Sequence, residues 1–116
     1  MGSASLIVMD ETTDMVWAAL KMTHFFRHES CGKCTPCREG TYWMEKVIDR
    51  LYHGGGTEAD IKLLESIAGN MVGKCLCALG EFATNPILSS IRYFLPEYKA
   101  KVAAGAGAKR PVVATA

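Results

Sequence analysis

The sequence lacks the features that would place its 116 residues in a membrane, on nucleic acid or outside the cell. No apolar run approaches the roughly 20 residues that a membrane-spanning helix needs, which argues against direct membrane insertion. The formal net charge is only +1, so no basic surface of the density that binds nucleic acid is expected. The first residues show no basic segment followed by an apolar core, as a signal peptide would. We therefore expect a cytoplasmic protein with reduced thiols.

A recognisable catalytic pattern is also lacking. There is no Ser/His/Asp or paired-carboxylate constellation, and Gly54–Gly56 follows a predicted helix rather than the strand that precedes a phosphate-binding loop. Two of the three histidines, His24 and His53, are expected to be ordinary helix residues. The third, His28, lies three residues before Cys31 and is expected to be a surface group or a hydrogen-bonding neighbour of that thiol.

What the sequence does contain is an informative set of five cysteines. Cys31, Cys34 and Cys37 are evenly spaced by three residues, and Cys75 and Cys77 follow far along the chain. Three thiols from one tight loop and a fourth from a distant segment are typical of proteins that hold a [4Fe–4S] cluster. Spacing alone does not decide whether Cys75 or Cys77 supplies the fourth thiolate.

Two other uses of these cysteines have to be compared with the cluster. A tetrahedral zinc site could be built from Cys31, Cys34, Cys75 and Cys77, but it would leave the evenly spaced Cys37 without a role. A disulfide framework would leave one of five thiols unpaired. The spacing therefore favours an iron–sulfur cluster, with structural zinc as the second interpretation.

The apolar pattern predicts four helices. Apolar residues recur at the spacing of a helix face in each segment, and each segment begins or ends at a cap, proline or glycine. The predicted helices run from Asp14 to His28 with Thr12 or Thr13 as its cap, from Thr35-Pro36 to Gly54, from Thr57 to Gly73, and from Asn85-Pro86 onward with a kink or restart at Pro96. Trp17 and Trp43 lie on or near these apolar stripes, so both are expected in the core.

The predicted fold is therefore all-α, a four-helix bundle with the cluster held by the loops at one end. We expect a short strand-like N-terminal arm at residues 1–11, the helical bundle at residues 12–102 and a flexible tail at residues 103–116. In an up-down bundle the first and third connections lie at the same end. Those are the two connections that carry the cysteines, so the thiols can converge on one site.

The residues around the thiols suit a buried anion. Cys37 is predicted in the first turn of a helix, where free N–H groups and the helix dipole favour negative charge. Lys33, Arg38 and Lys74 add positive charge, which should raise the reduction potential of a cluster. Three glycines, at positions 32, 40 and 73, would let the backbone approach inorganic sulfide.

The segment Glu29-Ser-Cys-Gly-Lys-Cys-Thr-Pro-Cys-Arg-Glu-Gly40 resembles the cluster-binding segment of the NADH-binding flavoprotein subunit of respiratory complex I and of bacterial NADH:quinone oxidoreductases. Ile7-Val-Met-Asp-Glu11 and Cys77-Ala-Leu-Gly80 are similar to that family as well. The resemblance implies that a [4Fe–4S] cluster is held by Cys31, Cys34, Cys37 and Cys77. It implies no ligand role for Cys75.

The same resemblance implies an electron-transfer domain of an NADH:quinone oxidoreductase (NADH dehydrogenase). Its cluster would relay electrons from reduced FMN, which oxidises NADH, towards further iron–sulfur centres and quinone. The implied partners are a 2Fe–2S thioredoxin-like subunit and a large multi-cluster subunit, at the inner face of the bacterial membrane when in complex. In the family, FMN and NADH bind in a preceding part, so we expect this chain to be a split-off or shortened piece that lacks those two sites.

Two alternatives accompany this prediction. The segment Asn85-Pro-Ile-Leu-Ser-Ser-Ile-Arg-Tyr-Phe94 also resembles related subunits of NAD-linked hydrogenases and formate dehydrogenases. The chain would then belong to a diaphorase-type subunit of such an enzyme. The other alternative is an interaction domain whose zinc, or another metal, merely staples the bundle.

Overall fold

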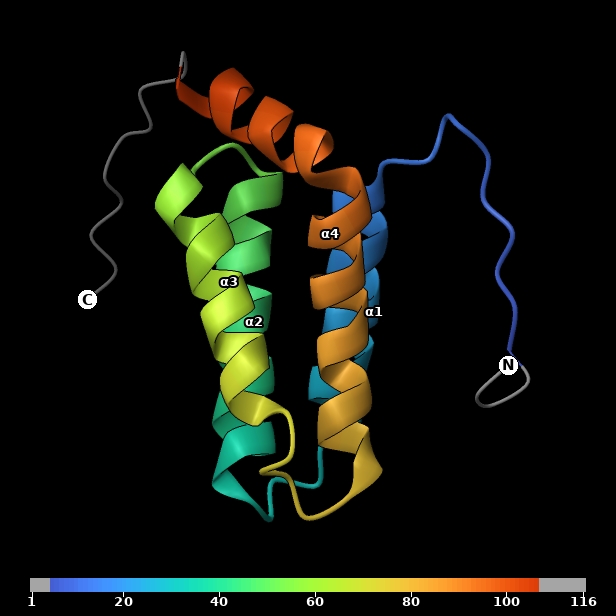
Figure 1. Cartoon of the computed structure of the whole chain (residues 1–116), viewed down its shortest axis with the longest axis vertical. Coiled ribbons are helices and arrows are strands. Elements are labelled where there is room, and N and C mark those ends of the chain that lie inside the picture. Colours follow the sequence, from blue (N-terminus) through green and yellow to red (C-terminus); the bar gives the residue numbers. More distant parts are fainter. Residues whose placement is uncertain (1–4, 107–116) are drawn as a thin grey trace.

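Four helices make up most of the chain in the computed structural model, which describes residues 5–106 (Figure 1). They are α1 (Met15–Glu29), α2 (Thr35–Tyr52), α3 (Glu58–Met71) and α4 (Ala78–Ala106). α1 and α3 each pack against both α2 and α4, and α2 also contacts α4. The predicted all-α four-helix bundle is confirmed.

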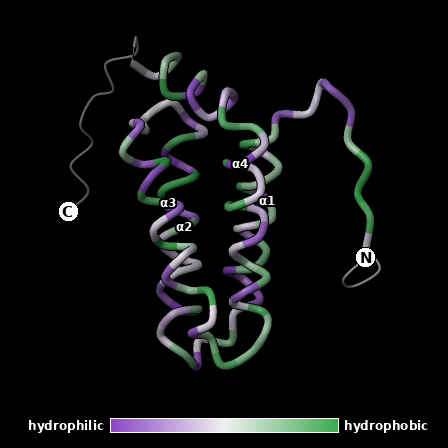
Figure 2. Tube along the Cα trace, viewed as in Figure 1, coloured by the Kyte–Doolittle hydropathy of each residue, from purple (hydrophilic) through white to green (hydrophobic). Residues whose placement is uncertain are grey.

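The segment before α1 forms an arm rather than a strand. Within the described part of the chain, residues 5–10 belong to no helix or strand. Leu6, Ile7 and Val8 are exposed, and Figure 2 shows this arm as a hydrophobic stretch. The apolar run at residues 5–9 therefore has no pairing strand within residues 5–106.

Helix α1 begins at a different cap from the one predicted. The Oδ1 atom of Asp14 accepts hydrogen bonds from the backbone N–H groups of Val16 and Trp17, at 3.0 and 3.1 Å. Thr12 instead donates its side-chain hydroxyl to Asp10. The carboxylate at position 14 reaches two unsatisfied N–H groups at once, which explains why it replaces the predicted threonine cap.

The starts of α2 and α3 follow the sequence more closely. Cys34 is the N-cap of α2, one residue before the predicted cap at Thr35, and Pro36 lies in the first turn. Thr57 is the N-cap of α3: its backbone N–H and its hydroxyl donate to the Asp60 carboxylate at 2.8 and 3.1 Å, and the Asp60 N–H donates to the Thr57 carbonyl at 3.0 Å. This reciprocal arrangement is the capping box that the sequence indicated.

Helix α4 starts earlier than predicted. It begins at Ala78, so Pro86 lies inside the helix instead of opening it. Ala83 and Thr84 are buried at 0% and 1% exposure, and extending the helix through them adds apolar contacts that offset the hydrogen bond lost at the proline. The helix also continues to Ala106, beyond the predicted bundle limit at residue 102. The rest of the predicted tail, from residue 107, lies outside the described residues.

The predicted break near Pro96 is present. Phe94 has non-helical angles, φ −126° and ψ 30°, and divides α4 into two parts. The second part lies across the end of the bundle, at the top of Figure 1. Its Glu97 Oε2 accepts a hydrogen bond from the Met15 backbone at 2.8 Å, and Lys101 pairs with Asp14. The kink thus fastens α4 to the first turn of α1.

The core lies where the four helices meet. Its buried members are Val16, Ala19, Met44, Val47, Ile48, Leu51, Ile61, Leu64, Ala68, Met71, Ala83, Ile87, Ile91 and Tyr98. Trp17 and Trp43 are 42% and 52% exposed, so their predicted burial is wrong. Each immediately adjoins a fully buried residue, and one step along a helix turns the side chain by about 100° away from the core.

Candidate metal centre

The two connections that carry cysteines lie at one end of the bundle. One joins α1 to α2 and the other joins α3 to α4, and both are at the bottom of Figure 1, opposite the kinked part of α4. The topology therefore brings residues 31–37 and residues 75–77 to the same end, although about forty positions separate them in the chain.

Three thiols belong to the first connection and the start of α2, and they differ in exposure. Cys31 is exposed, Cys34 is partly buried as the N-cap of α2, and Cys37 is buried at 6% exposure in the first helical turn. Gly32 between them has φ +74°, a left-handed conformation that glycine adopts without steric cost.

Cys37 is the most fixed of these thiols. Its sulfur lies 3.2 Å from the hydroxyl of Ser30, the residue that ends α1. Its carbonyl oxygen accepts a hydrogen bond from the Thr41 hydroxyl at 2.7 Å. This thiol is therefore held from both ends, at a helix N-terminus that favours negative charge on sulfur.

Arg38 ties the loop together. Its Nη1 donates to the Gly32 carbonyl at 2.7 Å, and its Nη2 donates to the Thr35 hydroxyl at 3.4 Å. The guanidinium thus places positive charge against the backbone of the cysteine loop. Lys33 and Lys74 are exposed in the two connections and add to the positive charge of this end.

In the second connection, Cys75 rather than Cys77 faces the other thiols. A Cβ built on Gly80 would lie 2.3 Å from the Cys75 sulfur and 3.2 Å from the Cβ of Cys37, so both side chains border the same small space. Burial, and then the negative charges of Cys34 and Cys37, raise the pKa of the Cys75 thiol to about 11. Cys77 is exposed. By spacing, Cys75 was a possible fourth ligand, and only the resemblance gave it no ligand role. The nearby Gly80 is the sequence feature that could have indicated its packing.

The two connections come close together at Cys34. The backbone N–H groups of Leu76 and then of Cys37 lie close enough to the Cys34 sulfur to lower the pKa of its thiol. Leu76 immediately precedes Cys77. The backbone next to Cys77 therefore lies near a thiol of the first connection.

The donor set fits an iron–sulfur cluster in its chemistry and its place in the fold. Thiolates are the ligands that iron–sulfur clusters take, and all five thiols lie at this end. Their side chains are not gathered into a cage: within residues 5–106, no group of three or more His, Cys, Asp or Glu side chains is arranged to hold a metal ion. Binding by Cys77 would require its side chain to turn inward from solvent.

Gly40 and the three histidines, which were also considered in the sequence analysis, have roles other than metal binding in this structure. Gly40 lies inside α2, where a Cβ would approach the Met71 sulfur to 2.3 Å, so it allows α2 and α3 to pack closely. The histidines pair with carboxylates: His24 with Glu45 at 2.6 Å, His28 with Glu29 at 3.2 Å and His53 with Asp49 at 3.2 Å.

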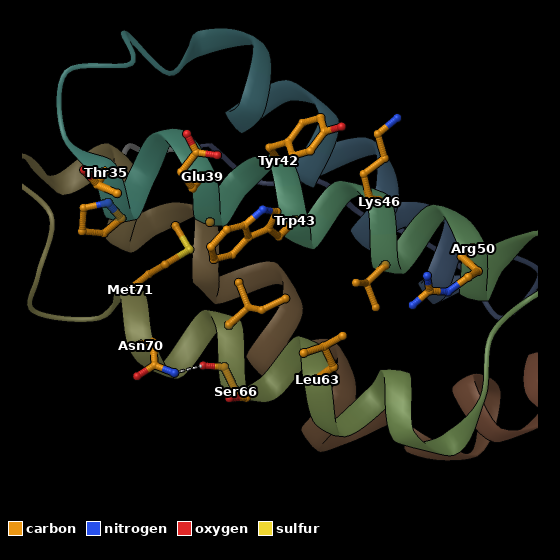
Figure 3. A pocket seen from close by; sticks show the side chains of 14 residues that line it. Thr35, Glu39, Tyr42, Trp43, Lys46, Arg50, Leu63, Ser66, Asn70 and Met71 are labelled. Carbon is orange, nitrogen blue, oxygen red and sulfur yellow. Dashed lines mark hydrogen bonds between the residues drawn. The ribbon is translucent and has the colours of Figure 1, made fainter. Parts of the chain in front are cut away.

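A separate groove of about 670 Å³ lies between α2 and α3 (Figure 3). Trp43, Leu63 and Met71 are among the residues that line it, and Asn70 donates a hydrogen bond to the Ser66 carbonyl at its edge. No cysteine lines this groove, so it is distinct from the thiol site.

Comparison with known proteins supplies independent evidence. Residues 17–101 match the family described as the NADH-ubiquinone oxidoreductase-F iron-sulfur binding region. The chain is 49% identical to a subunit of the NADH-quinone oxidoreductase of Mycobacterium bovis over 105 residues, which cover 90% of the chain and 24% of that relative. It is 47% identical to the mitochondrial NADH-ubiquinone oxidoreductase 51 kDa subunit of Neurospora crassa, covering 88% of the chain and 21% of that relative.

A solved structure is similar as well. The crystal structure of an NAD+-reducing [NiFe]-hydrogenase in its H2-reduced state matches with a TM-score of 0.78 and 34% identity, covering 82% of this chain and 16% of that one. The chain thus spans about a quarter or less of the relatives it matches. Within residues 5–106, no helix is long and apolar enough to cross a membrane.

Proposed function

The chain belongs to the NADH-ubiquinone oxidoreductase-F iron–sulfur binding family, and from this premise we propose that it transfers single electrons by way of one [4Fe–4S] cluster held at the thiol end of the bundle. The observation that carries the proposal is the meeting of two cysteine-bearing connections at that end, within a segment that matches the family over residues 17–101. When bound, such a cluster supplies a one-electron couple.

We propose Cys31, Cys34, Cys37 and Cys77 as the ligands. The first three thiols share one loop, where Gly32 turns the chain at φ +74°. Cys77 directly precedes Ala78-Leu79-Gly80, as the ligand does in the resembling family. The closeness of the Leu76 backbone to the Cys34 sulfur supports this choice, because Leu76 is the residue immediately before Cys77.

The residues around the thiols have two tasks in this proposal. Arg38, Lys33 and Lys74 offset the negative charge of four thiolates, which would otherwise be costly to hold partly away from water. Ser30 and the first turn of α2 fix the buried Cys37. Together they hold the donors in place while the charge of the site changes by one electron.

We propose that the chain works as part of a larger redox enzyme, an NADH:quinone oxidoreductase. Electrons would come from FMN reduced by NADH, in a part of the enzyme outside the quarter of the relatives that this chain matches. They would leave towards iron–sulfur centres in partner subunits, a 2Fe–2S thioredoxin-like subunit and a large multi-cluster subunit, and then to quinone. The bundle would lie in a peripheral part of the complex, at the inner face of the bacterial membrane.

A diaphorase-type subunit of an NAD-linked hydrogenase or formate dehydrogenase is the second candidate parent. The similarity to the NAD+-reducing [NiFe]-hydrogenase supports it, at 34% identity. Identity to the quinone oxidoreductase subunits is higher, at 49% for the Mycobacterium bovis protein. We therefore favour the quinone oxidoreductase.

An EPR-monitored redox titration of the anaerobically reconstituted chain tests the electron-transfer role. We expect a signal that appears and disappears reversibly in a single one-electron step. A protein that binds its metal tightly but shows no one-electron couple would instead support a structural staple. A protein that binds zinc in place of iron would likewise support a structural metal site.

A further inference from the structure

Ser30 occupies a special place beside the thiol site. It is the C-cap of α1, with φ −62° and ψ 124°, and it turns the chain out of the helix into the cysteine loop. This turn brings its hydroxyl oxygen to 3.2 Å from the sulfur of Cys37. Cys37 is the buried thiol of the site, at 6% exposure, so water competes little for this contact.

The neighbours of Ser30 decide which way its hydroxyl proton points. The backbone N–H of Gly32 donates to the Ser30 oxygen at 3.4 Å and takes up one of its lone pairs. A cysteine sulfur that binds metal is a thiolate, which accepts hydrogen bonds and cannot donate them. The Ser30 hydroxyl must then donate to Cys37.

Gly32 is itself held in place for this task. Its left-handed conformation, φ +74°, orients the N–H group, and the Arg38 guanidinium holds its carbonyl at 2.7 Å. Arg38, Gly32 and Ser30 thus form one connected support behind the Cys37 sulfur. Such support around ligands commonly tunes a metal site.

We propose that Ser30 is a positioning residue that raises the reduction potential of the cluster by donating a hydrogen bond to the Cys37 sulfur. The inference rests on the proposed function. It adds a residue that sets the reduction potential of the cluster and therefore the driving force for electron transfer. A hydrogen bond to a ligand sulfur stabilises the reduced, more negative form more than the oxidised form. The effect is strengthened at a buried sulfur, where the local dielectric is low.

The test compares Ser30→Ala, Ser30→Thr and a matched control, Ser89→Ala, each reconstituted anaerobically in the full chain. Ser89 is an exposed serine whose hydroxyl bonds only within its own helix, to the Asn85 carbonyl at 2.6 Å. The measurements are iron and sulfide content, helicity, and the midpoint potential from an EPR titration.

We expect Ser30→Ala to keep its iron and helicity but to have a more negative midpoint potential. The loss of one hydrogen bond to sulfur should lower the equilibrium constant for reduction by about threefold to tenfold, and a tenfold change corresponds to about 59 mV for one electron. Ser30→Thr keeps the hydroxyl and should restore the wild-type potential, and Ser89→Ala should equal the wild type.

Each other outcome has a definite meaning. If Ser30→Ala folds but holds less iron, and Ser30→Thr recovers it, the inference stands when the clusters that remain in Ser30→Ala have a more negative potential than the wild type, and it fails when their potential is unchanged. An unchanged potential in Ser30→Ala at full iron content overturns the inference, as does iron loss in both Ser30 variants. If the wild type itself shows no one-electron couple, the proposed function fails first, and that result is seen before any variant is made.

Discussion

At the residue scale, the fourth ligand is the sharpest question. The side chains of Cys75 and Cys37 lie together beside Gly80, whereas Cys77 is exposed and follows a residue whose backbone lies near Cys34. Packing alone would indicate Cys75 as the fourth ligand, whereas the resemblance to the family indicates Cys77. A half-buried cysteine behaves as a small apolar side chain, so the place of Cys75 needs no metal to explain it.

We predict that Cys77→Ser loses or converts the cluster, while Cys75→Ser keeps it. Serine at position 77 removes a thiolate ligand, whereas serine at position 75 removes only a packing contact. Iron and sulfide analysis with the EPR line shape measures both. The reverse pattern, with the cluster lost on changing Cys75 and kept on changing Cys77, would show that the ligand assignment is wrong at this position.

Tyr98 supplies a second prediction at this scale. It is fully buried, and its hydroxyl lies 2.7 Å from the hydroxyl of Ser90, which itself lies 3.1 Å from the Ile87 carbonyl. Burial raises the pKa of Tyr98 from 10 to about 12 despite the hydrogen bond to Ser90. Between these values the unfolded chain has lost a proton that the folded chain retains, so stability falls as the pH rises from 10 to 12.

We expect the free energy of unfolding to fall by on the order of 2 kcal/mol across that interval. Urea denaturation at several pH values measures it, and Tyr98→Phe provides the control because it cannot ionise. The account of Tyr98 is contradicted if the wild type and Tyr98→Phe lose the same amount of stability between pH 10 and 12.

Single residues were only partly predictable from the sequence. The apolar stripes of α2 and α3 are buried as predicted, because helical spacing directly reports the inner face. Trp17 and Trp43 look apolar by type, but their positions beside the stripe leave them half-exposed. Tyr98 was missed because its burial depends on the kink in α4, which turns the later part of the helix across the end of the bundle.

At the scale of the elements, the ends of the helices carry much of the specificity. Asp14 caps α1 and also pairs with Lys101 of α4. Burial acts to raise the pKa of Asp14, but the hydrogen bonds from Lys101, Trp17 and Val16 outweigh it and lower the pKa below its ordinary value. This stabilisation is present above the pKa of the unfolded chain and is lost as the pH falls through the folded value.

We predict that Asp14→Ala lowers the free energy of unfolding by about 1 to 2 kcal/mol, through the lost cap and the lost pairing with Lys101. Asp14→Asn should lose less, because asparagine can still cap the helix. Asp10→Ala is the matched control, since Asp10 is exposed and bonds only its own turn. Chemical denaturation measures all three, and equal losses in Asp14→Ala and Asp10→Ala would contradict this role.

The elements themselves were largely predictable, and their boundaries were less so. Capping at Thr57 and the break near Pro96 depend on local chemistry that the sequence states directly. The start of α4 was misplaced because Asn85-Pro86 resembles a helix start, and tertiary burial of Ala83 and Thr84 overrides that local signal. Local sequence sets a preference for where a helix begins, and tertiary packing decides between competing starts.

At the scale of the whole molecule, the bundle has two differently built ends. One end is closed by side-chain contacts, in which Glu97 and Lys101 of α4 hold the start of α1. The other end carries the thiols, where a shared cluster would join the α1–α2 and α3–α4 connections. The sequence correctly predicted that these two connections lie at the same end, because an up-down bundle must bring its first and third connections together.

This division predicts a local response to cluster removal. Stripping iron with a chelator under oxidising conditions should speed hydrogen exchange in residues 30–38 and 72–80, since the cross-link between the connections is gone. Exchange at residues 15–17 and 97–101 should stay unchanged. Equal acceleration throughout the bundle, or none in the two connections, would argue against a cluster that joins only the thiol end.

The most direct test of the central claim is the metal content of the anaerobically prepared chain, read together with its EPR spectrum. We predict about four irons and four sulfides per chain, a brown colour, and an EPR signal that appears on reduction. A colourless protein with one tightly bound zinc and no iron would contradict the claim and leave a bundle stapled by a structural metal.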